Sequence, residues 1–111
     1  MVLKEEIKNL LKNYLKENVE FGKDESYLCF RNDCSKEDFF EEIFSLNNFE
    51  YAVKQMKDGE ERYALYYVYS KKKGRVYVLR FYPEKIRVIT IFTIGRRTLN
   101  KYSKRRFKNK R

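Results

Sequence analysis

Histidine and tryptophan are both absent from this chain of 111 residues, and proline, cysteine and glycine are scarce, with one, two and four residues. The lack of histidine excludes Ser-His-Asp and Cys-His catalytic groups, paired-histidine metal sites and the histidine acid–base pairs of common nucleases. Cys29 and Cys34 alone cannot complete a tetrahedral zinc site, so we expect no metal and no small-molecule cofactor. A disulfide between them is open, but free thiols are the preferred interpretation.

Long hydrophobic runs are also lacking. No apolar stretch approaches the roughly 18 residues that a membrane span needs, and the longest one, residues 86–94, is interrupted by Arg87. The N-terminal Met1 leads straight into a charged amphipathic pattern and not into a signal peptide. We therefore expect a cytoplasmic protein that makes no use of a membrane.

What is present is enough for one core. The chain is 42% hydrophobic and holds ten Tyr and nine Phe, which fits a single domain over residues 1–111. Apolar residues recur at helical spacing over about residues 3–17, and Ser35 with Asp38 forms a capping-box pattern that opens a second helix over about residues 36–46. Residues 27–30 are a short strand candidate.

From residue 49 the period changes to two. Asp58-Gly59 and the Lys-rich stretch at residues 71–74 supply turns, and the alternating segments predict a meander of strands, at about residues 49–54, 63–69, 76–81 and 86–94. The last strand is apolar on both faces, which predicts an interior position. We therefore expect an α+β fold, with two or three helices packed on a mainly antiparallel four- to five-stranded sheet. The order would be α-β-α-β-β-β-β with a basic C-terminal helix or tail.

Acidic residues are missing from the C-terminal end. The chain carries a net charge of +10, and nine of its 26 Lys and Arg residues fall in the basic C-terminal segment at residues 96–111, which has no Asp or Glu. The rest of the chain is close to neutral. A solvated charged face usually mixes signs, so this segment predicts a surface for a polyanion, and RNA is the favoured partner.

A second group of cations lies at residues 71–75. In an antiparallel meander, the turn at residues 71–74 and the exit of the last strand, near residue 95, share one end of the sheet. Arg75 and Arg97 are therefore predicted to be neighbours in space. The predicted nucleic-acid-binding residues are Lys71, Lys72, Lys73, Arg96, Lys101, Lys104, Arg105, Arg106 and Lys108.

Residues 63–102 resemble the C-terminal half of the RelE/ParE toxin superfamily. The features that carry the resemblance are Gly74-Arg75, a strand over 76–81, the charged turn Pro83-Glu84-Lys85, the apolar strand 86–94, Gly95-Arg96-Arg97 and Tyr102. RelE-type toxins usually begin with a strand and a helical hairpin, whereas this chain is predicted to begin helix, strand, helix.

The resemblance implies a metal-independent endoribonuclease or another translation-inhibiting toxin, acting on mRNA at the ribosome and neutralised by an acidic antitoxin protein. In that chemistry the 2′-hydroxyl attacks the adjacent phosphate while cations stabilise the developing charge. By matching position, Arg75 and Arg97 would stabilise that charge and Tyr102 would act near the 2′-hydroxyl.

Two alternatives stay open. One is a non-catalytic protein that binds single-stranded nucleic acid or structured RNA, and the other is a protein-interaction module with an accessory or anti-defence role. An acidic cluster opens the second predicted helix and compensates its dipole better than it suits a metal. Its members are Glu37, Asp38, Glu41 and Glu42.

Overall fold

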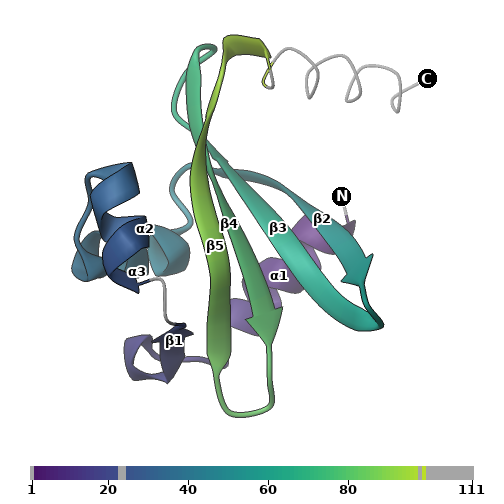
Figure 1. Ribbon diagram of the computed structural model, residues 1–111. Helices are drawn as coiled ribbons and strands as arrows, with labels where there is room; N and C mark the ends of the chain where they lie inside the picture. The colour runs from purple at the N-terminus through teal and green to yellow at the C-terminus, as the bar shows by residue number, and fades with distance from the viewer. Residues whose placement is uncertain (1, 23–24, 98, 100–111) are drawn as a thin grey trace.

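The protein is a mixed five-stranded sheet with its three α-helices on one face, an α+β fold as the sequence predicts (Figure 1). The computed structural model describes residues 2–22, 25–97 and 99. The elements are α1 (Val2–Leu11), a 3₁₀ turn η1 (Lys16–Asn18), β1 (Val19–Phe21), α2 (Glu25–Asn32), α3 (Lys36–Ser45), β2 (Phe49–Lys57), β3 (Glu60–Val68), β4 (Lys73–Phe81) and β5 (Ile86–Gly95).

The four long strands form the predicted antiparallel meander. The sheet order is β1-β5-β4-β3-β2, so β5 is an interior strand, as its two apolar faces predict. Asp58 and Gly59 join β2 to β3 with φ angles of 53° and 78°, the left-handed backbone that a two-residue hairpin turn requires. The short strand β1 completes the sheet by pairing in parallel with the start of β5, Val19 opposite Ile86.

Two local predictions are wrong. Residues 27–30, predicted as a strand, belong to α2, where Leu28 and Asn32 lie one helical turn apart and are buried while Phe30 is 86% exposed. A short apolar run cannot be assigned to helix or strand by periodicity alone. The first helix ends at Leu11 and not near residue 17, and the strand that follows it, β1, lies at Val19–Phe21, where no strand was predicted.

The second predicted helix, which is α3 in the structure, is confirmed in detail. Ser35 accepts a hydrogen bond from the Asp38 amide at 3.2 Å, and the Asp38 carboxylate accepts one from the Ser35 amide at 2.9 Å. These two bonds satisfy amides that the first turn of α3 would otherwise leave unpaired, and they lower the pKa of Asp38. The helix therefore begins where the capping box predicts.

The core lies between the helices and one face of the sheet. It is built from aromatic and aliphatic side chains, among them Ile7 and Leu11 of α1, Leu28 of α2, Phe39 and Ile43 of α3, and Leu65, Tyr67, Tyr77 and Leu79 of the sheet. A smaller apolar cluster lies on the other face: Ala64, Val76, Val78, Ile94 and Leu99. Successive residues of a strand therefore face different surroundings, and this decides which charged side chains reach solvent.

Beyond the end of β1, the outer edge of β5 is covered by α2. The Arg31 guanidinium and the Asn32 amide both donate to the Ile91 carbonyl oxygen, at 3.0 and 3.2 Å. These bonds pair a carbonyl that no neighbouring strand reaches. They also fix α2 against the strand whose exit forms part of the site described next.

Candidate nucleic-acid interface

One end of the sheet carries a group of cations contributed by two separate segments. Lys73 pairs with Gly95 across β4 and β5, so the β3–β4 turn and the exit of β5 lie side by side, as the sequence predicts (Figure 1). We call the five described cations of this region the basic end: Lys71, Lys72, Lys73, Arg96 and Arg97. All five are exposed.

Gly74 allows the two segments to approach closely. A Cβ atom at this position would lie 2.8 Å from the Tyr67 carbonyl oxygen and 3.1 Å from Ile94 Cγ1, closer than packed atoms allow. The predicted turn glycine is therefore a strand glycine, opposite Ile94 in the register. It lets the Ile94 side chain pack over β4 directly below the cations.

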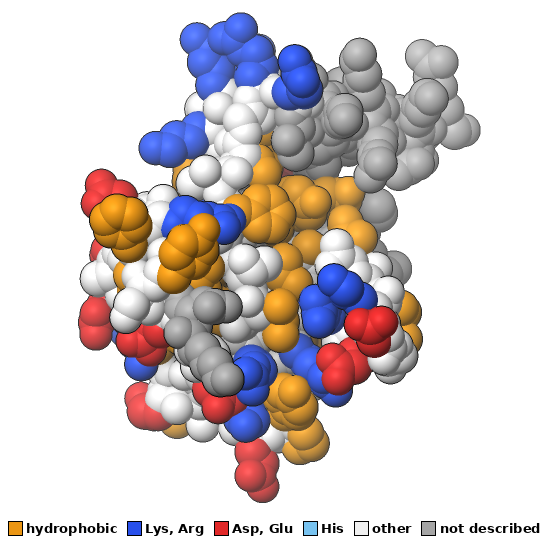
Figure 2. Space-filling view, viewed as in Figure 1, with side chains coloured by type: hydrophobic (Ala, Val, Ile, Leu, Met, Phe, Trp, Pro, Cys, Tyr) orange, Lys and Arg blue, Asp and Glu red, His pale blue; other side chains and the backbone are white. Residues whose placement is uncertain are grey.

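The cations of the basic end are not compensated by carboxylates. None of them forms an ion pair with any residue that the structure describes, whereas six ion pairs lie elsewhere in that part of the chain. Figure 2 shows the difference: Lys and Arg side chains alone gather at the top of the molecule, and acidic and basic side chains are interspersed below. Exposed charge of one sign at one end produces a local positive potential that attracts phosphate groups.

Arg75, predicted to act with Arg97, is directed elsewhere. Alternation along β4 places its side chain on the helix-covered face, where its Nη1 lies 3.0 Å from the Glu42 Oε1 of α3. The side chains of Arg75 and Glu42 are only 12% and 15% exposed. No described contact joins Arg75 to Arg97, which is exposed beyond the end of β5. The structure thus pairs the Arg75 guanidinium with Glu42, and the predicted proximity of Arg75 and Arg97 stays a prediction.

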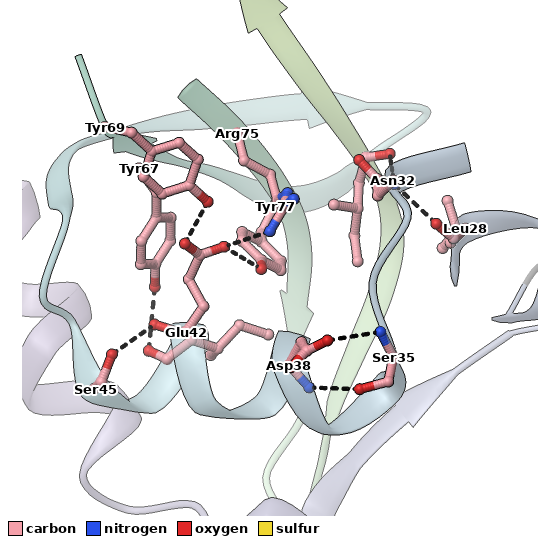
Figure 3. A network of polar contacts seen from close by, with 12 residues as sticks. Leu28, Asn32, Ser35, Asp38, Glu42, Ser45, Tyr67, Tyr69, Arg75 and Tyr77 are labelled. Atoms are coloured by element: carbon pink, nitrogen blue, oxygen red, sulfur yellow. Dashed lines mark hydrogen bonds and ion pairs between the residues drawn. The ribbon is translucent and has the colours of Figure 1, made fainter. Parts of the chain in front are cut away.

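Glu42 is the centre of a polar cluster between α3 and the sheet (Figure 3). Its Oε1 accepts bonds from Arg75 and from the Tyr77 hydroxyl, the latter at 2.5 Å, and its Oε2 accepts one from the Tyr69 hydroxyl. We call these four residues the Glu42 cluster. The Tyr67 hydroxyl donates beside it to the Ile43 carbonyl oxygen at 3.1 Å.

The chemistry of the Glu42 cluster favours a structural role. Burial, followed by the hydrogen bond to the carboxylate, raises the pKa of both Tyr69 and Tyr77 well above the ordinary tyrosine range. Both phenols therefore stay protonated near neutral pH and act as hydrogen-bond donors. The Arg75 guanidinium also lies over the Phe39 ring, 5.8 Å from its centroid. Together these contacts fix α3 to the sheet and offset the charge of Arg75.

Sequence reasoning assigned Glu42 only to the dipole of its helix. Its real partner is on β4, 33 residues further along the chain. One signal was available: Arg75 alternates with Tyr77 and Leu79 along β4, and both lie in the helix-covered core. A cation on the same face of β4 as Tyr77 and Leu79 points toward the covering helices, so its counterion would be expected from one of them.

Tyr69 was not predicted as a functional residue, yet it borders the basic end. It directly precedes the β3–β4 turn, its side chain is 36% exposed, and the Arg75 guanidinium lies 5.9 Å from its ring centroid. An aromatic ring held beside exposed cations presents a face on which a base can stack.

The remaining predicted residues lie outside the described part of the chain. They are Lys101, Tyr102, Lys104, Arg105, Arg106 and Lys108. Within the described part, no helix is long and apolar enough to cross a membrane. No protein-family model, curated protein or solved structure matches the chain significantly.

Proposed function

We propose that the protein binds RNA through the basic end. The observation that supports this proposal most strongly is the pairing of Lys73 with Gly95, which brings the cations of the β3–β4 turn beside Arg96 and Arg97. Exposed ammonium and guanidinium groups with no nearby carboxylate are free to contact phosphate oxygens. Guanidinium groups bind them in a bidentate manner, which adds orientation to charge.

Single-stranded RNA fits this surface better than duplex. Recognition of single strands combines phosphate contacts with stacking of unpaired bases on aromatic rings, and Tyr69 supplies such a ring beside the cations. If about five cations contacted phosphates of a single strand, the logarithm of the affinity would fall with the logarithm of salt concentration at a slope of roughly −3.5.

Fluorescence anisotropy with a labelled single-stranded oligoribonucleotide tests the proposal. The informative variant is Arg96→Glu/Arg97→Glu. Its matched control is Lys12→Glu/Lys16→Glu, which changes the net charge by the same amount on exposed residues. These residues flank Tyr14, whose hydroxyl donates to the Tyr82 carbonyl oxygen at the opposite end of the sheet. At low salt we expect the first variant to lose on the order of 100-fold in affinity and the control to stay within about threefold.

Equal losses in both variants would contradict the proposal, because binding would then follow net charge and not the basic end. Tyr69→Phe and Tyr69→Leu test the stacking contribution separately. The first variant keeps the ring and loses the bond to Glu42, and the second loses both, so stacking predicts weaker binding by Tyr69→Leu than by Tyr69→Phe.

RelE-like cleavage of the bound RNA is a second candidate function. The observation that favours it is the element order from β1 onward: a strand, the helix pair α2 and α3, and then the antiparallel meander. This order resembles the strand-and-hairpin beginning of RelE-type toxins, and here it follows α1. An acidic antitoxin would be a natural competitor for the basic end.

In that reaction the 2′-hydroxyl gives up its proton and its oxygen forms a bond to the adjacent phosphorus, while the bond to the 5′-oxygen breaks and that oxygen takes up a proton. The products are a 2′,3′-cyclic phosphate and a 5′-hydroxyl. Arg97 is exposed and available to the developing charge, whereas the charge of Arg75 is already offset by Glu42. The reaction therefore depends on Arg97 and on Tyr102, the residue that the resemblance places near the 2′-hydroxyl.

End-labelled RNA separates the two candidates. Cleavage predicts cyclic-phosphate products that Arg97→Ala or Tyr102→Phe reduces, and growth arrest on induced expression that Arg97→Ala relieves. Passive binding predicts intact RNA at saturating protein, with affinity that survives Tyr102→Phe.

A further inference from the structure

The two cysteines of the chain are brought together by the way in which α2 ends. The Cys34 amide donates to the Cys29 carbonyl oxygen at 3.1 Å, and the Asp33 amide donates to the Phe30 carbonyl oxygen at 3.2 Å. Asp33, between the helix and Cys34, has a φ of 52°, in the left-handed region. These features define a Schellman motif, in which the residue three positions inside the helix end and the second residue beyond it are hydrogen-bonded.

In a Schellman motif the side chains of those two residues commonly contact each other. Here both are thiols. Cys29 and Cys34 are half-buried, free, and packed against the same hydrophobic core. A disulfide requires Cα atoms about 4.4–6.8 Å apart, and the 3.1 Å hydrogen bond between the backbones of Cys34 and Cys29 brings the two residues close together.

We propose that Cys29 and Cys34 form a dithiol site that closes to a reversible intramolecular disulfide when the protein meets a small-molecule disulfide. The proposal is independent of RNA binding. It concerns the junction between α2 and α3, and Cys34 directly precedes Ser35, the N-cap of α3. The oxidised pair would therefore tie the last turn of α2 to the first residue of the next helix.

The order of reaction follows from the surroundings of the two thiols. Burial, with added repulsion from Glu25, raises the pKa of Cys29, so its thiol is poorly ionised near neutral pH. Cys34 lies outside the helix, in the short loop between α2 and α3. Cys34 is therefore the attacking residue and Cys29 the resolving one.

With glutathione disulfide as the oxidant, the steps balance. The Cys34 thiolate attacks one glutathione sulfur, the S–S bond of glutathione disulfide breaks, and one glutathione thiolate leaves. The Cys29 thiol then gives its proton to solvent and attacks the Cys34 sulfur, which releases the second glutathione. Two protein thiols are oxidised to one disulfide, and one glutathione disulfide is reduced to two thiols.

The experiment equilibrates the full-length chain in glutathione buffers of increasing oxidised fraction, traps free thiols by alkylation, and measures intact and peptide masses. We expect a species with no alkylated thiol and no bound glutathione, in which the peptides of Cys29 and Cys34 are linked. Cys29→Ser and Cys34→Ser should instead carry one glutathione each under oxidising conditions. Reduction should restore two alkylatable thiols in the unsubstituted chain.

Asp33 provides a matched pair of geometric variants. Asp33→Gly keeps the left-handed turn, whereas Asp33→Pro can neither adopt its φ nor donate to the Phe30 carbonyl. We expect the equilibrium constant for disulfide formation to be lower in Asp33→Pro by roughly tenfold or more than in Asp33→Gly. Circular dichroism checks that both variants remain folded.

Two results would overturn the proposal. In one, the unsubstituted chain forms only mixed disulfides with glutathione or links between chains. In the other, both thiols stay reduced in the most oxidising buffer. Because these readings use the unsubstituted protein, they decide the matter even if Asp33→Pro fails to fold.

Discussion

Lys73 and Arg75 are two residues apart on β4, yet they belong to regions of opposite character. Lys73 is exposed at the basic end, where no described carboxylate compensates its charge. Arg75 is largely buried in the Glu42 cluster, with an ion pair at 3.0 Å and two tyrosine hydroxyls bonded to the same carboxylate. In the sequence, both belong to the group of cations at residues 71–75. Residues two apart on a strand lie on the same face of the sheet, so the difference comes from what covers that face: α3 brings Glu42 to Arg75, whereas Lys73 stays exposed.

The two regions also differ in what their charges contribute. Exposed cations at the basic end add little to folding stability and remain available for a ligand. The Glu42 cluster depends on mutual satisfaction: removing one member leaves a poorly solvated charge. The Arg75 Nε is already buried without a hydrogen-bond partner in the described part of the chain, so loss of Glu42 would leave a second nitrogen of this guanidinium without its carboxylate.

The largest expected effect comes from Glu42→Ala. This variant removes the acceptor of three hydrogen bonds and leaves the Arg75 charge without its counterion, so we expect a loss of about 3 kcal/mol in the free energy of unfolding. Chemical denaturation measures it. Glu42→Gln keeps acceptor capacity for the tyrosines and should lose clearly less. Equal losses would mean that charge compensation of Arg75 accounts for the whole effect and that the hydrogen bonds from the tyrosines add nothing.

A pair of variants on β4 separates stability from binding. Arg75→Ala should lower the free energy of unfolding by about 2 kcal/mol because it leaves Glu42 unpaired, with RNA affinity nearly unchanged. Lys73→Ala should leave stability nearly unchanged and reduce the salt slope of RNA binding by roughly 0.7, the loss of one phosphate contact. Denaturation and salt-dependent anisotropy on the same two proteins give both readings. If Arg75→Ala weakened binding more than Lys73→Ala, Arg75 and not only Tyr69 of the Glu42 cluster would be part of the interface.

High pH should weaken the contacts that tyrosine hydroxyls make in the body of the protein. Hydrogen bonding to Glu61, with burial, raises the pKa of Tyr63 to about 12, and the pKa values of Tyr69 and Tyr77 are also raised. A tyrosine whose pKa is higher in the folded state adds stability that is complete below its unfolded pKa of about 10. That stability is lost as pH rises through the folded value.

Tyrosinate absorbance during a pH titration checks this expectation. The three phenols should ionise later in the folded protein than in denaturant, and Glu42→Gln should lower the pKa of Tyr77 by removing the carboxylate that opposes its ionisation. A Tyr77 that titrates identically in both proteins would show that Glu42 has no influence on it.

The parts of the fold that depend on neighbouring residues could be predicted from the sequence. The capping box of Ser35 and Asp38 and the Asp58-Gly59 turn follow from local chemistry, and strict alternation gave the four strands of the meander. The strand β1 was missed at its true place because three residues are too few for a periodic signal. Residues 27–30 were predicted as a strand because all four are apolar, although they lie in a helix and Phe30 faces solvent.

The candidate site was predictable to the extent that strand connectivity determines it. Short links forced an antiparallel meander, and parity then placed the Lys-rich turn beside the exit of β5, which the register confirms. The ion pair of Arg75 could not be predicted from neighbouring residues because its counterion, Glu42, comes from a helix that packs on the sheet. Ion pairs between distant segments become visible only when the packing of the layers is known.

The smallest expected effect tests how α3 is held in place for the Glu42 cluster. Ser35→Ala removes the side chain that accepts from the Asp38 amide, and we expect a loss of about 1 kcal/mol in the free energy of unfolding. Because the bonds from Ser35 lower the pKa of Asp38, the stability they provide is present above the unfolded pKa of that carboxyl and is lost as pH falls through the folded value. Ser35→Ala keeps the backbone amide that donates to the Asp38 carboxylate, so both proteins should lose this stability in acid, which denaturation curves at several pH values would measure. If Ser35→Ala lowered the free energy of unfolding as much as Glu42→Ala does, the N-cap and not the Glu42 cluster would determine where α3 lies. The different surroundings of Lys73 and Arg75 would then depend on the first turn of that helix.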